Sequence, residues 1–149
     1  MKKIVMILTV VLLSFTAYAQ QNNDNTEARK EAREQRAKQI EAQKIAYMTQ
    51  ALELTVQQSQ EFWPIYNQYD AEVQKLFRER RKLHRNLEGD NVTKEDIDLL
   101  LDKEAAMVEL RRSYVPSFVK VLSVSQAARI FVAEENFKQE LVRSLRKND

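Results

Sequence analysis

Apolar residues recur every three or four positions along four long stretches of this chain. Because an α-helix turns once in ~3.6 residues, this spacing gathers the apolar side chains on one helical face. The chain has one glycine and two prolines, too few for the many turns of a β-rich domain. The pattern therefore predicts an all-α fold, with about four helices over residues 27–52, 56–88, 94–119 and 124–146.

The second stretch has the most regular apolar face. Its members follow a heptad spacing of the coiled-coil type, and they are Phe62, Tyr66, Tyr69, Val73, Leu76, Leu83 and Leu87. Arg80 stands where this spacing would place a leucine. Either its aliphatic stem reaches out to water, or the face opens there into a polar groove. A helix over residues 56–88 would be about 50 Å long, so an elongated or curved molecule is expected.

Two prolines fall inside predicted helices. Pro64 should kink the second helix, and Pro116 should kink or end the third, because proline removes a helical hydrogen bond. The first half of residues 27–52 has alanines and charged residues but almost no large apolar side chain. A core face is expected only later, at Ile45, Met48 and Leu52. The beginning of this helix should therefore fray or need a partner.

Hydroxyl residues at the helix starts predict capping boxes. In such a box a Thr or Ser side chain bonds the amide three residues on, and the side chain of that residue reaches back. The spacing occurs at Thr55–Gln58, Thr93–Asp96 and Ser123–Gln126. These boxes place the starts of the second, third and fourth helices.

The first nineteen residues have the three parts of a secretory signal peptide. Two lysines begin it, an apolar run covers residues 4–15, and small residues precede a cut between Ala19 and Gln20. The alternative is a retained membrane anchor, but the run is shorter than the ~20 residues that a spanning helix needs. We therefore expect export, cleavage and no stable membrane insertion afterwards. Residues 20–26 are polar and predict a disordered tail, which leaves 27–149 as a single helical domain.

Cleavage of the leader changes the charge balance. The whole chain has 24 Lys+Arg against 22 Asp+Glu, and the leader contains two lysines and no acid. The remainder is then balanced at 22 against 22, which gives no electrostatic reason to expect nucleic acid binding. The chain has no cysteine, so apolar packing must stabilise the fold without disulfides.

The residues needed for common catalytic and metal sites are missing. There is one histidine and no cysteine, whereas transition-metal sites gather several His, Cys or carboxylate ligands. A single glycine excludes a glycine-rich phosphate loop. The serines have no histidine partner in the neighbouring sequence. The sequence therefore predicts no enzyme, no cofactor and no metal.

Two features could contact a partner protein. The first is a basic run, made of Arg78, Arg80, Arg81, Lys82 and Arg85. It is either a solvated helical face or a surface for acidic or partly unfolded proteins. The second is Trp63, which lies off the heptad positions in an aromatic cluster around Pro64. Helical spacing favours core packing for that cluster, whereas an exposed Trp63 would suit a partner contact.

Two of the boxes resemble the LTxxQ repeat of the Spy/CpxP family of periplasmic proteins. Residues 54–58 read Leu-Thr-Val-Gln-Gln and match fully, whereas residues 122–126 read Leu-Ser-Val-Ser-Gln and replace Thr by Ser. The replacement keeps the capping hydroxyl. We interpret the motif residues as helix caps and not as a client site, and they are Leu54, Thr55, Gln58, Leu122, Ser123 and Gln126.

The resemblance implies a curved helical hairpin in the periplasm, often dimeric. It implies a concave face that binds unfolded or aggregation-prone envelope proteins without ATP. The alternative within the same family is an envelope-stress regulator that docks on a membrane sensor or an anti-sigma factor. Relatives that bind metal use several His, Cys or Met ligands, whereas this chain has one histidine, no cysteine and four methionines, so metal binding is not carried over. Monomer and homodimer both stay open.

Overall fold

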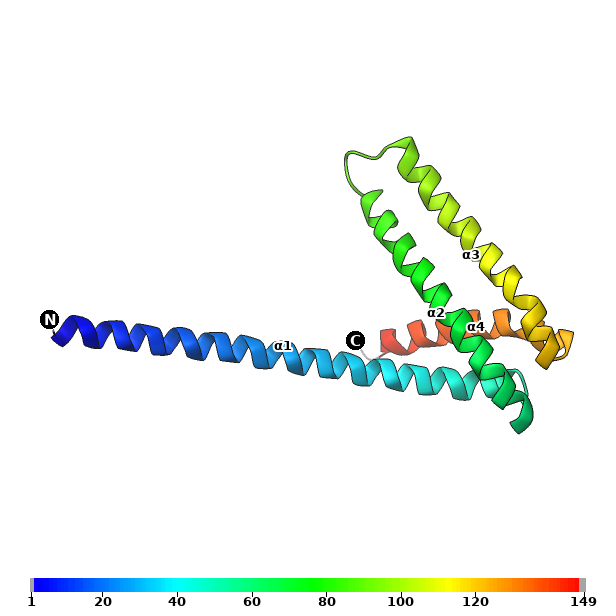
Figure 1. Ribbon diagram of the computed structural model, residues 1–149, viewed down its shortest axis with the longest axis horizontal. Helices are drawn as coiled ribbons and strands as arrows, with labels where there is room; N and C mark the ends of the chain where they lie inside the picture. Colours follow the sequence, from blue (N-terminus) through cyan, green and yellow to red (C-terminus); the bar gives the residue numbers. More distant parts are fainter. Residues whose placement is uncertain (1, 148–149) are drawn as a thin grey trace. The chain divides into compact units, whose positions relative to one another are not determined.

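The computed structural model describes the backbone of residues 2–147 and the side chains of residues 26–146 (Figure 1). It consists of four helices, α1 (Lys2–Ala51), α2 (Val56–Asn86), α3 (Lys94–Val121) and α4 (Val124–Lys147). The described residues include no strand. The predicted all-α fold of about four helices is therefore confirmed, and the ends of α2, α3 and α4 lie within two residues of the predicted ones.

Helix α1 begins much earlier than predicted. It includes residues 20–26, for which the sequence predicted a disordered tail. No glycine or proline precedes Pro64, so nothing in the backbone interrupts the helix there. The side chains of residues 1–25 lie outside the described part, and cleavage of the leader stays a prediction. Among the described residues, no helix combines the length and the apolar character needed to cross a membrane.

The chain forms two compact units, Met1–Ala46 and Tyr47–Asp149. The single helical domain over 27–149 stays a prediction. Residues 26–46 of α1 offer few large apolar side chains to pack. Ile45, which was expected to face the core, is exposed, whereas Met48 and Leu52 are fully buried.

The core of the second unit lies where helix ends meet. It draws on the end of α1, the first half of α2, the end of α3 and the first half of α4. Its buried members are Met48, Leu52, Phe62, Tyr66, Tyr69, Phe118, Leu122, Ala127, Ile130 and Ala133. Figure 1 shows α2 and α3 running antiparallel, joined by the loop after α2. Residues 73–110, which form the outer half of this hairpin and are called the arm below, include no fully buried side chain.

Neither proline ends its helix. Pro64 lies inside α2 and Pro116 inside α3, and α3 continues to Val121. Of the two alternatives for Pro116, an end of the third helix at this residue is therefore excluded. Packing of Phe118 and Leu122 into the core stabilises the last turn of α3 beyond the proline.

Helix α1 ends in a tight left-handed turn. The amide of Leu54 donates to the carbonyl of Thr49, and the amide of Glu53 donates to that of Gln50, both at 3.1 Å. This is the Schellman pattern, in which the residue after the helix is usually glycine. Here Glu53 takes that position with a φ of 52°. The turn redirects the chain into α2.

Candidate functional site

Both LTxxQ-like boxes cap their helices. At the start of α2, Thr55 Oγ1 accepts from the Gln58 amide and Gln58 Oε1 accepts from the Thr55 amide, each at 3.1 Å. At the start of α4, Ser123 Oγ accepts from the Gln126 amide at 3.2 Å, and Gln126 Oε1 accepts from the Ser123 amide at 3.0 Å. Orphan amides of both first turns are therefore satisfied.

The two boxes also bind each other, which the sequence did not predict. Gln58 Nε2 donates to Gln126 Oε1 at 3.1 Å, and Gln126 Nε2 donates to Gln58 Oε1 at 3.3 Å. Gln126 Nε2 also donates to the carbonyl of Leu52 at 3.0 Å. We call these three groups the glutamine clasp. It ties the end of α1 to the starts of α2 and α4.

The aromatic cluster around Pro64 is mainly core. Phe62, Tyr66 and Tyr69 are fully buried, and Tyr69 meets Phe118 of α3 edge-on with ring centroids 5.5 Å apart. Trp63 is half-buried and makes edge contacts to Phe62 and Tyr66, with centroids 5.2 and 5.5 Å away. Trp63 therefore supports the rim of the core and is only partly open to a partner.

Glu134 is the polar centre of this cluster. Its Oε1 accepts from the Tyr66 hydroxyl at 3.0 Å, and its Oε2 accepts from the Tyr69 hydroxyl at 3.3 Å. Burial, and then the Glu134 carboxylate, raise the pKa of both tyrosines, while Arg111 acts in the opposite direction on Tyr69. Both hydroxyls therefore stay protonated and keep donating at neutral pH.

Glu134 was not among the residues predicted from the sequence, although its position along α4 carries a signal. Glu134 lies four residues after Ile130 and three before Phe137. It therefore occupies the inward face of α4, where a charge needs a hydrogen-bond partner.

Arg80 faces the third helix. Its Nη1 lies 3.5 Å from Glu104 Oε1, and its guanidinium carbon lies 5.2 Å from the centroid of the Phe77 ring. Nearby, Lys103 Nζ donates a hydrogen bond to Glu79 Oε2 at 2.8 Å. This hydrogen bond and the positive charge of Lys103 lower the pKa of Glu79. Two ion pairs therefore link α2 and α3 at the position of Arg80 in the apolar face.

The remaining basic residues share the outer face of α2. Arg78, Arg81, Lys82 and Arg85 are all exposed, and their spacing of three and four residues places them on one side of the helix. Trp63 lies fifteen residues before Arg78, which is about 22 Å along a helix. The structure therefore does not bring Trp63 and the basic residues into one site.

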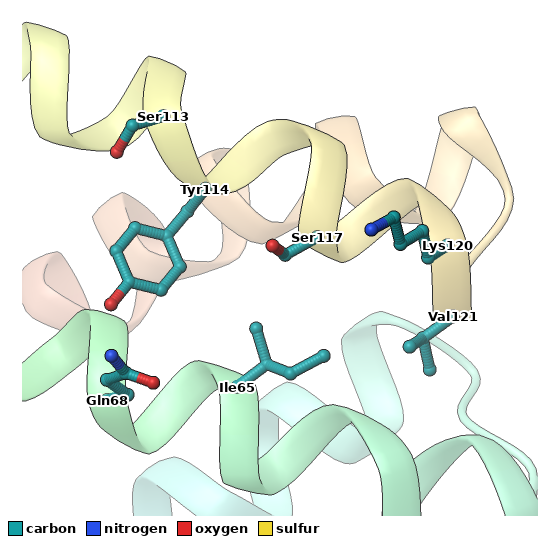
Figure 2. A pocket seen from close by; sticks show the side chains of 7 residues that line it. All are labelled: Ile65, Gln68, Ser113, Tyr114, Ser117, Lys120 and Val121. Atoms are coloured by element: carbon teal, nitrogen blue, oxygen red, sulfur yellow. The ribbon is translucent and has the colours of Figure 1, made fainter.

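A shallow groove lies between α2 and α3, as Figure 2 shows, with a volume of about 460 Å³. Its lining residues are Ile65, Gln68, Ser113, Tyr114, Ser117, Lys120 and Val121. Tyr114 donates to Glu72 at 2.7 Å and Ser113 Oγ donates to the Leu110 carbonyl at 2.8 Å. Burial, followed by the bond to Glu72, raises the pKa of Tyr114 to about 12. Two of the groove's hydroxyls are therefore engaged within the protein.

The described residues include no group of three His, Cys, Asp or Glu side chains that could hold a metal ion. Comparisons with models of known protein families, with curated proteins and with solved structures give no match. The function is therefore inferred from the surfaces described above and from the two LTxxQ-like boxes.

Proposed function

We propose that this protein is a periplasmic, ATP-independent, chaperone-like protein that binds unfolded or aggregation-prone proteins of the cell envelope. The observation that carries the proposal is the arm, residues 73–110, which has no fully buried side chain. Its apolar groups, such as Leu76 and Met107, are only half-buried. A surface of this kind can contact apolar segments of a client without a fixed pocket.

The charges of the arm suit clients of varied sequence. Residues 75–88 of the α2 side have six Lys or Arg and two Glu, whereas residues 94–109 of the α3 side have two Lys and six Asp or Glu. Apolar groups therefore lie between a basic and an acidic helix. Unfolded segments of either charge find complementary groups there, which favours broad over selective binding.

Export and the family resemblance support the same proposal. The leader over residues 1–19 directs the chain across the inner membrane, into a compartment where a client binder has to work without ATP. The single glycine of the chain also leaves no glycine-rich loop for a nucleotide phosphate.

A second candidate is an envelope-stress regulator. The outer basic face of α2 favours it, because Arg78, Arg81, Lys82 and Arg85 present four cations on one side of a helix. Such a face suits one acidic partner, for example a membrane sensor or an anti-sigma factor. A regulator would bind that partner tightly and leave unfolded proteins unbound.

The test is the aggregation of a denatured model protein, followed by light scattering, with purified protein and no nucleotide. The chaperone proposal expects suppression at near-stoichiometric ratios. Arg81→Glu/Arg85→Glu should weaken suppression by about tenfold, because each exposed charge contributes up to ~1 kcal/mol. The matched control is Arg143→Glu/Arg146→Glu, which makes the same change of charge on exposed residues of α4.

Equal loss in both variants would mean that net charge, and not the arm, controls suppression. No suppression by protein shown to be helical by circular dichroism would reject the chaperone proposal and favour the regulator.

A further inference from the structure

Five cations lie together on the outer face of α2, within the arm. All five are exposed, and they are Lys75, Arg78, Arg81, Lys82 and Arg85. At ~100° per residue they fall within a sector of about 120° around the helix axis, over about 15 Å of its length. We call these five residues the cation strip. Its middle lies about 160° from Arg80, which pairs with Glu104, so the strip lies on the side of α2 opposite α3.

The charges of the cation strip are not neutralised within the described part of the protein. Among the residues that the structure describes, none of the five takes part in an ion pair. Residues 75–85 include one acid, Glu79, which bonds Lys103 of α3 instead. The guanidinium carbon of Arg81 lies 5.0 Å from the centroid of the Phe77 ring, a contact that leaves its charge in place. The strip therefore offers several cations to an external anion.

The cation strip lacks the anchors of a protein-binding hot spot. Such hot spots are built on aromatic or apolar groups that become fully desolvated, and interface cores are depleted of charge. From Ala71 to Arg85, the sector of α2 that contains the strip has no apolar side chain larger than that of Ala71. A membrane surface needs no such anchor, because anionic headgroups attract each nearby Lys or Arg separately. The composition of the strip therefore favours a lipid surface over a protein.

The other helix of the arm carries the opposite charge. Residues 94–109 of α3 have two Lys and six Asp or Glu. A negatively charged membrane attracts the cation strip and repels this acidic helix, which favours one orientation of the arm. Without the leader, Lys+Arg and Asp+Glu are balanced at 22 against 22. The attraction therefore comes from the distribution of charge in the arm and not from the net charge.

We propose that the cation strip binds the phosphate headgroups of an anionic membrane surface, with α2 of the arm lying along the membrane and α3 turned away from it. The bond is electrostatic, and no segment of the arm inserts into the bilayer. The proposal does not depend on the chaperone function, because a lipid surface and not an unfolded protein occupies the strip.

The first test is co-sedimentation of the purified protein, expressed as the full chain, with phosphatidylglycerol vesicles at low ionic strength. The wild type should bind these vesicles but not vesicles of phosphatidylcholine, whose headgroup has no net charge. Binding should be largely lost in about 0.5 M NaCl, where the Debye length is about 4 Å. A retained leader would add the same apolar contribution to every variant, and salt does not screen that contribution.

The strip variant is Arg78→Glu/Lys82→Glu. It should weaken vesicle binding by more than about tenfold, because each Lys or Arg near an anionic surface strengthens binding about fivefold. The matched control is Arg143→Glu/Arg146→Glu, which makes the same change of net charge on exposed residues of α4. The control should bind within about twofold of the wild type, since the membrane contacts the strip.

Two further comparisons test the kind of surface and the orientation. Arg78→Lys/Arg85→Lys keeps both charges and should bind vesicles within about twofold of the wild type, whereas a protein site that recognises the planar guanidinium would be weakened. The chain has no cysteine, so a polarity-sensitive fluorophore can be attached at Gln74→Cys beside the strip or at Asp102→Cys on α3, both exposed positions. Only the label at residue 74 should change its emission on addition of vesicles.

Absence of binding to phosphatidylglycerol vesicles at low ionic strength would overturn the proposal. Equal loss in the strip variant and the α4 control would overturn it as well, because net charge and not the strip would then control binding. Neither result bears on the chaperone proposal, since the light-scattering assay contains no lipid and the vesicle assay contains no client. Circular dichroism of each variant establishes that it is folded.

Discussion

Glu53 ends α1 in a backbone conformation that favours glycine. With a φ of 52°, its Cβ is crowded against the backbone, at a cost of about 1 kcal/mol or more relative to glycine. The Glu53 side chain pairs with Arg129 at 3.2 Å, but it is largely exposed, so this pair contributes little.

Glu53→Gly should therefore raise the free energy of unfolding by up to about 1 kcal/mol. Urea denaturation followed by circular dichroism measures the change. Glu53→Ala is the control, because it removes the ion pair and keeps the crowded Cβ. If glycine and alanine destabilise the protein equally, the turn is not strained.

Tyr66 and Tyr69 make stability sensitive to alkaline pH. Burial and the Glu134 carboxylate raise the pKa of both above their ordinary value of 10.0. The folded state therefore holds these protons more tightly than the unfolded state. Their contribution is fully present below the unfolded pKa and is lost as pH rises above it.

Urea unfolding between about pH 8 and pH 11 should thus show a steeper loss of stability above pH ~10 in the wild type than in Tyr66→Phe/Tyr69→Phe. The double variant should have a lower free energy of unfolding at pH 8, because Glu134 loses two hydrogen-bond donors. The comparison therefore uses the slope of the unfolding free energy against pH and not its absolute value. Equal slopes would contradict the pKa assignment.

At the scale of elements, the glutamine clasp couples two helix starts that are far apart in the chain. Each glutamine closes its own capping box and bonds the other, 68 residues away. Local capping and long-range packing therefore depend on the same two side chains. This gives the LTxxQ-like repeat a physical role in holding α1, α2 and α4 together.

Gln126→Ala should lower the free energy of unfolding by about 2 kcal/mol, through the loss of a cap contact and of part-buried hydrogen bonds. Gln58→Ala/Gln126→Ala should lower the free energy of unfolding by less than the sum of the two single changes. The difference, which is the coupling energy between the two glutamines, should be at least about 0.5 kcal/mol. The reference is Asp96→Ala, because the Thr93 box of α3 has the same local bonds. Strict additivity would mean that the two boxes act separately.

At the scale of the whole molecule, the second compact unit begins at Tyr47. The fully buried residues that the structure describes begin with Met48. Residues 26–46, by contrast, are exposed or half-buried. The stability of the second unit should therefore not depend on most of α1.

A chain that begins at residue 44 should unfold in urea within about 0.5 kcal/mol of the protein that begins at residue 20. A chain that begins at residue 54 loses Met48 and Leu52, and each deleted core side chain costs about 2–5 kcal/mol. It should therefore be strongly destabilised. Equal destabilisation by both truncations would place part of the core before residue 44.

The sequence by itself determined the features that depend on near neighbours. Helical periodicity and the capping spacings at Thr55, Thr93 and Ser123 are set by contacts within about four residues, so they could be read along the chain. They predicted the all-α fold and placed the ends of α2, α3 and α4 within two residues. The same local information failed at Ile45, which is exposed although its helical spacing predicted a core position.

Only the tertiary structure decided which distant groups meet. Gln58 bonds Gln126 across 68 residues, Tyr66 bonds Glu134 across the same separation, and Arg80 pairs with Glu104. Each pairing depends on how helices pack, and periodicity specifies the face that is buried but not the helix that covers it.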